Sequence, residues 1–150
     1  DMGMFYKRRD YTQIIDGRNP IVAHEFLGTS VENKDMIIID DMISSGESVL
    51  EVAAALKARK AGRIFVFSTF GLFTGGLGKF DRAYEAGMTT NLIYQTPELL
   101  QRKWYISCDL SKYIAYIIDT LNHDSSISDL LNPNERIQSI VSRYKTGDLQ

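Results

Sequence analysis

The sequence lacks the features that would tie it to an oxidising compartment, a membrane or a nucleic acid. Its single cysteine, Cys108, excludes an internal disulfide and is typical of the reducing cytosol. No run approaches the ~20 apolar residues that a membrane-spanning helix needs. The formal net charge is −2 and the pI is about 5.7, so there is no basic surplus to attract a nucleic acid. We therefore expect a cytoplasmic protein whose partners are small molecules.

A metal site built from cysteine and histidine is also not expected. The two histidines, His24 and His123, lie far apart in the sequence, and neither stands at metal-ligand spacing from the other or from Cys108. A lone histidine at the surface or in a half-buried position is the simpler interpretation of each.

What the chain does contain is the composition of one globular domain. It has 150 residues, of which 44% are hydrophobic, and a chain of this size buries roughly 70% of its unfolded surface. Asp1-Met2-Gly3 leads directly into the apolar residues Met4–Tyr6, as if a strand were entered partway. We therefore expect residues 1–150 to form a single domain that belongs to a longer protein.

Short apolar runs alternate with stretches of helical periodicity. Strands are predicted at 4–7, 21–27, 35–40, 64–67, 91–94 and 105–108. Helices are predicted at 46–60, 79–85 and 110–121 and after Asn132-Pro133, with a connection at 10–20. The run at 35–40 lacks apolar–polar alternation, which is typical of a strand buried on both faces of a parallel sheet, and 64–67 is expected to be the next buried strand. The fold class is therefore α/β, with a mainly parallel sheet flanked by helices.

The strongest chemical signal lies between Met36 and Val49. An apolar run leads into an acidic pair, Asp40 and Asp41, and then into a small polar turn, Ser44–Ser48, before a helix begins. We call this turn the cradle. In open α/β sheets, ligands bind at the carboxyl ends of strands, where loops meet helix N-termini. The N–H groups and hydroxyls of the cradle could hold a phosphate there, and Gly46 permits a close approach or a positive φ.

The acidic pair would weaken a site for a bare phosphate. It makes sense if the ligand presents hydroxyls or a divalent cation beside its phosphate, as a sugar phosphate does. A simpler interpretation is that Asp40 and Asp41 only end a strand and cap a helix.

The full string from the apolar run to Ser48 resembles the phosphoribosyl-diphosphate (PRPP) signature of type I phosphoribosyltransferases, with serines where threonines are commoner. Lys7-Arg8-Arg9 resembles the start of the flexible catalytic loop of ribose-phosphate pyrophosphokinases, or PRPP synthetases. Residues 63–75 resemble that family's strand and "Thr-His…Ser-Gly" loop, and residues 125–131 its "Ser-Ile-Ser" segment. The resemblance covers nearly the whole chain and places it as the C-terminal half of such an enzyme.

This resemblance implies a type I phosphoribosyltransferase-like fold and a reaction of ATP with ribose 5-phosphate that gives PRPP and AMP with Mg²⁺. Lys7 and Arg9 would close over ATP and stabilise charge on its β-phosphate. Asp40 and Asp41 would contact the ribose hydroxyls, directly or through Mg²⁺. The 5-phosphate would be held by Ser44, Ser45, Gly46, the backbone of Glu47, and Ser48. Members of this family assemble from dimers into hexamers, so a homo-oligomer is expected.

The chain departs from the family pattern in three ways. Phe70 stands where the family often has a histidine after Thr69. The N-terminal half and a second phosphate-binding loop lie outside this sequence, so the fragment alone is expected to be inactive. The segment 85–90 is shorter than the apolar strand that the family places before its "Thr-Asn", because this branch has lost residues there or because residues are missing from the numbered sequence.

Two other functions stay open. A salvage phosphoribosyltransferase would use the same signature to consume PRPP, although no base-binding hood is evident. A non-catalytic, regulatory relative of the synthetases would bind the sugar phosphate without turnover, and the residue at Phe70 keeps this alternative open.

Overall fold

The computed structural model describes residues 2–9 and 21–148, and the chain divides into two compact units. Unit 1 is Asp1–Ser107 and unit 2 is Cys108–Gln150. The connection predicted at 10–20 lies outside the described residues. Within the described ranges, every helix is too short or too polar to cross a membrane.

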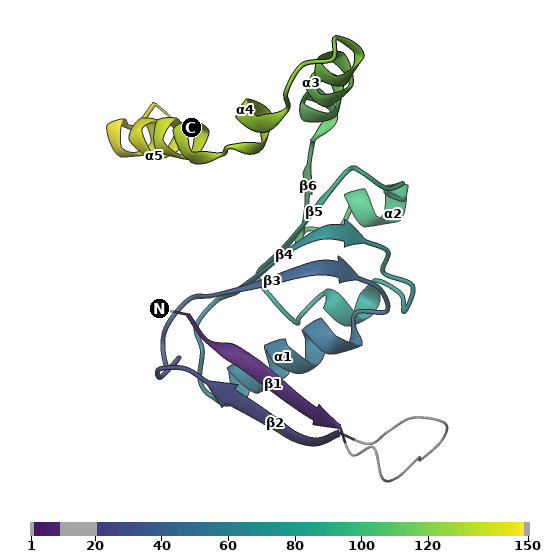
Figure 1. The fold of residues 1–150 in the computed structure, drawn as a ribbon. Helices are drawn as coiled ribbons and strands as arrows, with labels where there is room; N and C mark the ends of the chain where they lie inside the picture. The colour runs from purple at the N-terminus through teal and green to yellow at the C-terminus, as the bar shows by residue number, and fades with distance from the viewer. Residues whose placement is uncertain (1, 10–20, 149–150) are drawn as a thin grey trace. The chain divides into compact units, whose positions relative to one another are not determined.

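Unit 1 is an α/β arrangement built on two sheets (Figure 1). The smaller sheet is an antiparallel hairpin of β1 (Met4–Arg9) and β2 (Ile21–Leu27). The larger sheet has the order β3-β4-β5-β6, with strands at Met36–Ile43, Ile64–Gly71, Ala86–Thr90 and Tyr105–Cys108. The pairs β3–β4 and β4–β5 are parallel, which confirms the mainly parallel α/β fold.

Helix α1 (Glu47–Ala58) covers one face of this sheet (Figure 1). Val49, Ala53 and Leu56 stand at helical spacing and are buried. They form the core together with Ile64 and Val66, which are fully buried on β4. The opposite face of β3 is open, since Ile39 is 81% exposed. The apolar periodicity of α1 therefore determines which face of the sheet becomes the core.

An aromatic cluster belongs to the same core. It contains Phe73, Phe80, Tyr84, Trp104 and Tyr105, and several of its ring pairs meet edge to face. Phe80 is fully buried, in a short 3₁₀ helix (Gly78–Phe80) where the sequence predicted a helix over 79–85. The hydroxyl of Tyr84 is buried and has no hydrogen-bond partner among the described residues, and this burial raises its pKa.

The prediction of a strand at 91–94 is wrong. The strand is β5, Ala86–Thr90, and it is followed by a turn and the short helix α2 (Pro97–Leu100). The N–H of Gly87 donates to the carbonyl of Trp104, at 2.8 Å, and a Cβ at Gly87 would lie 2.8 Å from Cε2 of Tyr84. The segment Ala86–Thr90 is more polar than a typical buried strand, but its pairing with neighbouring backbone and the covering ring of Tyr84 make it the strand. Tyr94, in the segment that was predicted instead, is 81% exposed.

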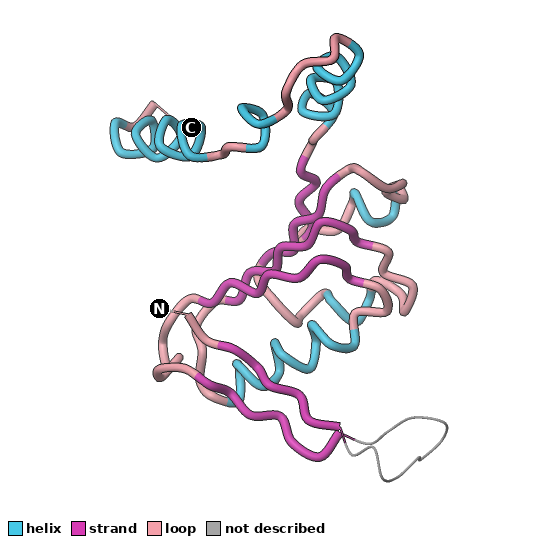
Figure 2. The backbone as a smooth tube through the Cα atoms, in the orientation of Figure 1, coloured by secondary structure: helices cyan, strands magenta, loops and turns pink. Residues whose placement is uncertain are grey.

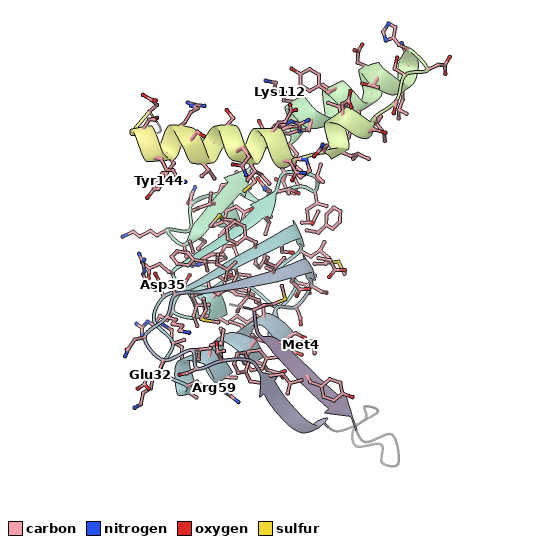
Figure 3. All side chains as sticks on the ribbon, turned by 60° about the vertical axis from the view of Figure 1, so that its left-hand side comes forward. Met4, Glu32, Asp35, Arg59, Lys112 and Tyr144 are labelled. Carbon is pink, nitrogen blue, oxygen red and sulfur yellow. The ribbon has the colours of Figure 1, made fainter. Side chains whose placement is uncertain are left out.

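Unit 2 contains three helices, α3 (Ser111–Asn122), α4 (Ser128–Leu131) and α5 (Asn134–Thr146) (Figure 2). Lys112 lies on α3 and Tyr144 on α5 (Figure 3). The guanidinium of Arg136 lies over the ring of Tyr113, 5.1 Å from its centroid, and donates to the carbonyl of Leu130 at 3.1 Å. None of the described residues of this unit is buried, so its short helices enclose no core of their own.

Candidate active site at the N-terminal end of helix α1

The cradle is the sharp connection between β3 and α1. The strand continues through Asp40 and Asp41 to Ile43, three residues further than predicted. Gly46 then adopts φ 86° and caps the helix. A Cβ at this glycine would overlap Cζ of Phe80 and lie 2.7 Å from its Cε1. Both the left-handed backbone and the ring of Phe80 therefore require glycine at position 46.

Most of the predicted substrate residues line one hollow of about 240 Å³. The structure brings Asp40 together with the whole cradle, and the lining residues are Asp40, Met42, Ile43, Ser44, Ser45, Gly46, Glu47, Ser48 and Val49. Asp41 is not among them. The hollow thus joins the carboxylate of Asp40 to a helix N-terminus, which is the combination that a sugar phosphate requires.

The two aspartates differ because they are neighbours in a strand. Successive side chains of a strand point to opposite faces of the sheet, and Asp40 is half-buried while Asp41 is exposed. The N–H of Asp41 donates to Oδ1 of Asp40, at 2.9 Å. Burial raises the pKa of Asp40, and the neighbouring carboxyl of Asp41 raises it further. Asp40 is thus the carboxylate that gains most from a ligand hydroxyl or a cation.

The cradle also offers peptide donors. The first N–H groups of a helix have no partner within the helix, and the helix dipole places a partial positive charge there. The intrahelical bonds start with the N–H of Leu50, which donates to the carbonyl of Gly46 at 3.0 Å. Before it, the N–H of Glu47 donates only a long hydrogen bond, 3.4 Å, to Oγ of Ser45, so the first turn keeps donors for an anion.

A loop that the sequence analysis did not assign to the site braces the cradle. The N–H of Leu72 donates to the carbonyl of Ile43 at 2.8 Å, and that of Thr74 donates to the carbonyl of Ser44 at 3.0 Å. Gly75 is the sequence signal for this close approach, because a Cβ there would lie 2.6 Å from the carbonyl oxygen of Ser45. The conformation of the cradle therefore depends on the segment after β4 as well as on β3.

The predicted catalytic residues, Lys7 and Arg9, lie in β1, opposite His24 and Ile21 of β2. Their side chains are outside the described part of the chain, so their role stays a prediction. Among the described residues, no group of three or more acids, histidines or cysteines could hold a metal ion. A Mg²⁺ ion in the hollow would take the carboxylate of Asp40 together with oxygens from substrate and water, which is the mixed coordination that Mg²⁺ accepts. The predicted pairing with Asp41 would require that side chain to reach round the end of the strand.

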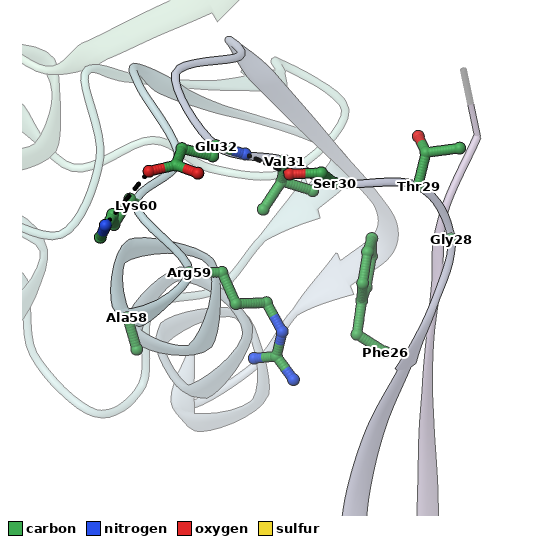
Figure 4. Close-up of a pocket in the computed structure, with 9 residues that line it drawn as sticks. All are labelled: Phe26, Gly28, Thr29, Ser30, Val31, Glu32, Ala58, Arg59 and Lys60. Atoms are coloured by element: carbon green, nitrogen blue, oxygen red, sulfur yellow. Dashed lines mark hydrogen bonds and ion pairs between the residues drawn. The ribbon is translucent and has the colours of Figure 1, made fainter.

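A second hollow, of about 360 Å³, lies at the opposite end of α1 (Figure 4). Lys60 and Glu32 meet at its rim, with 3.2 Å between Nζ and Oε1. The guanidinium of Arg59 lies 5.7 Å from the ring centroids of both Phe5 and Phe26, and donates to the carbonyl of Ala55. These contacts attach the hairpin to α1 and give the hollow a structural role.

Comparison with known proteins finds similarity to one group of proteins, the phosphoribosyl synthetases. A family model described as "Phosphoribosyl synthetase-associated domain" matches residues 17–132. Two similar curated proteins are the ribose-phosphate pyrophosphokinases of Vibrio cholerae and Pasteurella multocida. The first is 28% identical over 134 residues, which cover 88% of this chain and 40% of that protein. The second is 31% identical over 130 residues, which cover 85% and 39%.

The fold has a solved counterpart in phosphoribosylpyrophosphate synthetase from Mycobacterium smegmatis. The TM-score is 0.64 at 17% identity, and the match covers 69% of this chain and 35% of the other. This likeness shows the type I phosphoribosyltransferase-like fold. The chain spans about 40% of the length of the curated relatives that it matches. Since the family model covers most of the sequence, the chain belongs to the phosphoribosyl synthetase-associated domain family.

Proposed function

We propose that the protein to which this chain belongs is a ribose-phosphate pyrophosphokinase. It would transfer the diphosphate of ATP to the anomeric hydroxyl of ribose 5-phosphate, giving PRPP and AMP. The observation that carries this proposal is the shared hollow of Asp40 and the cradle, because it pairs a hydroxyl acceptor with a phosphate site. The names of the curated relatives support the same reaction.

In this proposal ribose 5-phosphate binds with its phosphate on the cradle. The N–H groups and serine hydroxyls of Ser44–Ser48 hold the phosphate oxygens. The carboxylate of Asp40 accepts hydrogen bonds from the ribose hydroxyls within the same hollow, and Asp41 approaches from the opposite face of the strand end. The sugar is thereby held at both ends, which fixes its anomeric hydroxyl.

The transfer itself needs positioning and charge stabilisation. The oxygen of the anomeric hydroxyl attacks the β-phosphorus of ATP, the bond from that phosphorus to the α-phosphate oxygen breaks, and AMP leaves while the hydroxyl proton passes to solvent. We assign to Lys7 and Arg9 the stabilisation of charge on the transferred group. Bound Mg²⁺ would neutralise the phosphate oxygens beside the acidic pair. Homo-oligomer assembly and a cytoplasmic location belong to the same proposal.

The test uses the full-length protein with ATP, Mg²⁺ and ribose 5-phosphate. We expect stoichiometric AMP and PRPP, and no AMP when ribose 5-phosphate is omitted. The fragment 1–150 alone should be inactive, since it spans only about 40% of its relatives. A folded full-length protein that forms no AMP would exclude the synthetase reaction.

One observation supports a second candidate, a non-catalytic relative that binds the sugar phosphate. Phe70, where the family often has histidine, pairs in register with Met42 and is 37% exposed at the ligand edge of the sheet. A phenyl ring can neither donate a proton nor bind a metal at that position. Binding of ribose 5-phosphate without AMP formation would favour this candidate.

A further inference from the structure

The hollow at the cradle contains no basic group of its own. Of the residues that line it, the charged ones are Asp40 and Glu47, which are both acids. A phosphate monoester carries about −1.5 to −2 charges at neutral pH, while a helix N-terminus contributes only about half a positive charge. A cation from another part of the fold is needed to balance the ligand.

The loop after β4 contacts the cradle closely enough to supply this cation. Its backbone bonds to Ile43 and Ser44 bring Gly75 directly against the next residue, Ser45. A Cβ at Gly75 would lie 2.6 Å from the carbonyl oxygen of Ser45. The loop therefore follows the cradle at backbone contact distance.

The side chain of Lys79 reaches the same point. The same Cβ at Gly75 would overlap Nζ of Lys79 and lie 3.0 Å from its Cε, so the ammonium and the Ser45 carbonyl lie against the same glycine. Nζ is also 5.6 Å from the centroid of Phe80, the ring that packs against Gly46. Lys79 is exposed and forms no ion pair with any residue in the ranges 2–9 and 21–148.

Building on the ribose 5-phosphate site proposed above, we propose that Lys79 is a further phosphate-binding residue of the cradle. From its place against Gly75, which also contacts the Ser45 carbonyl, its ammonium polarises the peptide group whose N–H belongs to Gly46 and strengthens that donor. Its flexible four-carbon stem lets the ammonium move toward a bound phosphate. Lys79 thus supplies the positive charge that the lining side chains lack.

The test measures ribose 5-phosphate affinity by calorimetry in the full-length protein. Lys79→Met keeps the aliphatic stem on Phe80 and removes the charge, and we expect about tenfold weaker binding. Lys79→Arg keeps the charge and should stay within about threefold of the parent protein. Added salt should weaken binding to the parent more than to Lys79→Met, because the lost interaction is a screened charge pair.

The matched control is Lys57→Met, which removes the same charge in the last turn of α1, about 15 Å along the helix from the cradle. Equal affinities of Lys79→Met and Lys57→Met would refute the role of Lys79 and leave the proposed reaction intact. Failure of the parent protein to bind ribose 5-phosphate would instead refute the site itself. Lys79→Gln provides a second neutral variant in case methionine disturbs the contact with Phe80.

Discussion

The two ends of helix α1 differ in whether their charged side chains have partners within the fold. Near its C-terminal end, Lys57 donates to the carbonyl of Gly62 at 2.8 Å, Lys60 pairs with Glu32, and Arg63 donates to Asp35. Near its N-terminal end stand three acids, Asp40, Asp41 and Glu47, and none of them forms an ion pair with any residue that the structure describes. The C-terminal, paired end uses its charges for contacts within the fold, whereas the N-terminal, unpaired end keeps its acids available for a ligand.

Replacing Gly46, at the N-terminal end of α1, should have the largest effect on both stability and ligand binding. In Gly46→Ala the new methyl group meets both an unfavourable φ and the ring of Phe80. We expect a loss of roughly 3 kcal/mol in the free energy of unfolding, measured by denaturant titration, and no detectable ribose 5-phosphate binding.

Gly76→Ala is the matched control, because Gly76 has almost the same φ, +85°, and nothing within 4 Å of a Cβ. It should cost only the backbone strain, about 1 kcal/mol. Equal losses in the two variants would show that Phe80 does not restrict the cradle.

The acidic pair should respond unequally. Asp40 shares the hollow with the cradle and Asp41 does not, so Asp40→Asn should weaken ribose 5-phosphate binding by about a hundredfold and Asp41→Asn by about tenfold. Both affinities can be measured by calorimetry in the full-length protein. Unchanged affinity in both variants would remove the pair from the site, and a larger loss in Asp41→Asn would mean that the ligand lies over the opposite face of the strand.

The smallest change in stability is expected from a substitution at the paired, C-terminal end of α1. Hydrogen bonds from Arg63 lower the pKa of Asp35, so its stabilising contribution is present above the unfolded-state pKa and is lost as pH falls through the folded-state pKa. Asp35→Asn should therefore lower the melting temperature slightly at neutral pH, converge with the parent in acid, and leave ribose 5-phosphate affinity unchanged. A persistent difference in acid would show that packing, and not charge, makes the contribution.

Local sequence signals were sufficient for the elements around the cradle. The apolar run of β3 and the helical spacing of Val49, Ala53 and Leu56 lie where they were predicted, although β3 continues three residues beyond its predicted end. In each of these segments the local pattern of apolar residues is enough to predict the element. The cradle is contiguous in sequence, so its residues could be named as candidates without knowledge of the fold, and their role in binding stays a prediction.

The remaining features depend on contacts between distant residues. β5 forms at a polar segment because β4 and Trp104 provide its hydrogen-bond partners. Asp40 and Asp41 point to opposite faces of the sheet because β3 continues through them to Ile43, beyond its predicted end. Lys79 lies 34 positions after Ser45 in the sequence, and no local pattern indicates that its ammonium lies beside that carbonyl.

The left-handed turn at Gly46 has an evolutionary consequence. A phosphate held mainly by peptide N–H groups depends on the path of the backbone, so the hydroxyl side chains around it can interchange serine and threonine with little effect. Selection in such a site would act on the glycine and on the ring beneath it more strongly than on the residues that surround the ligand. The cradle could thus drift far in sequence and still recognise the same chemical group.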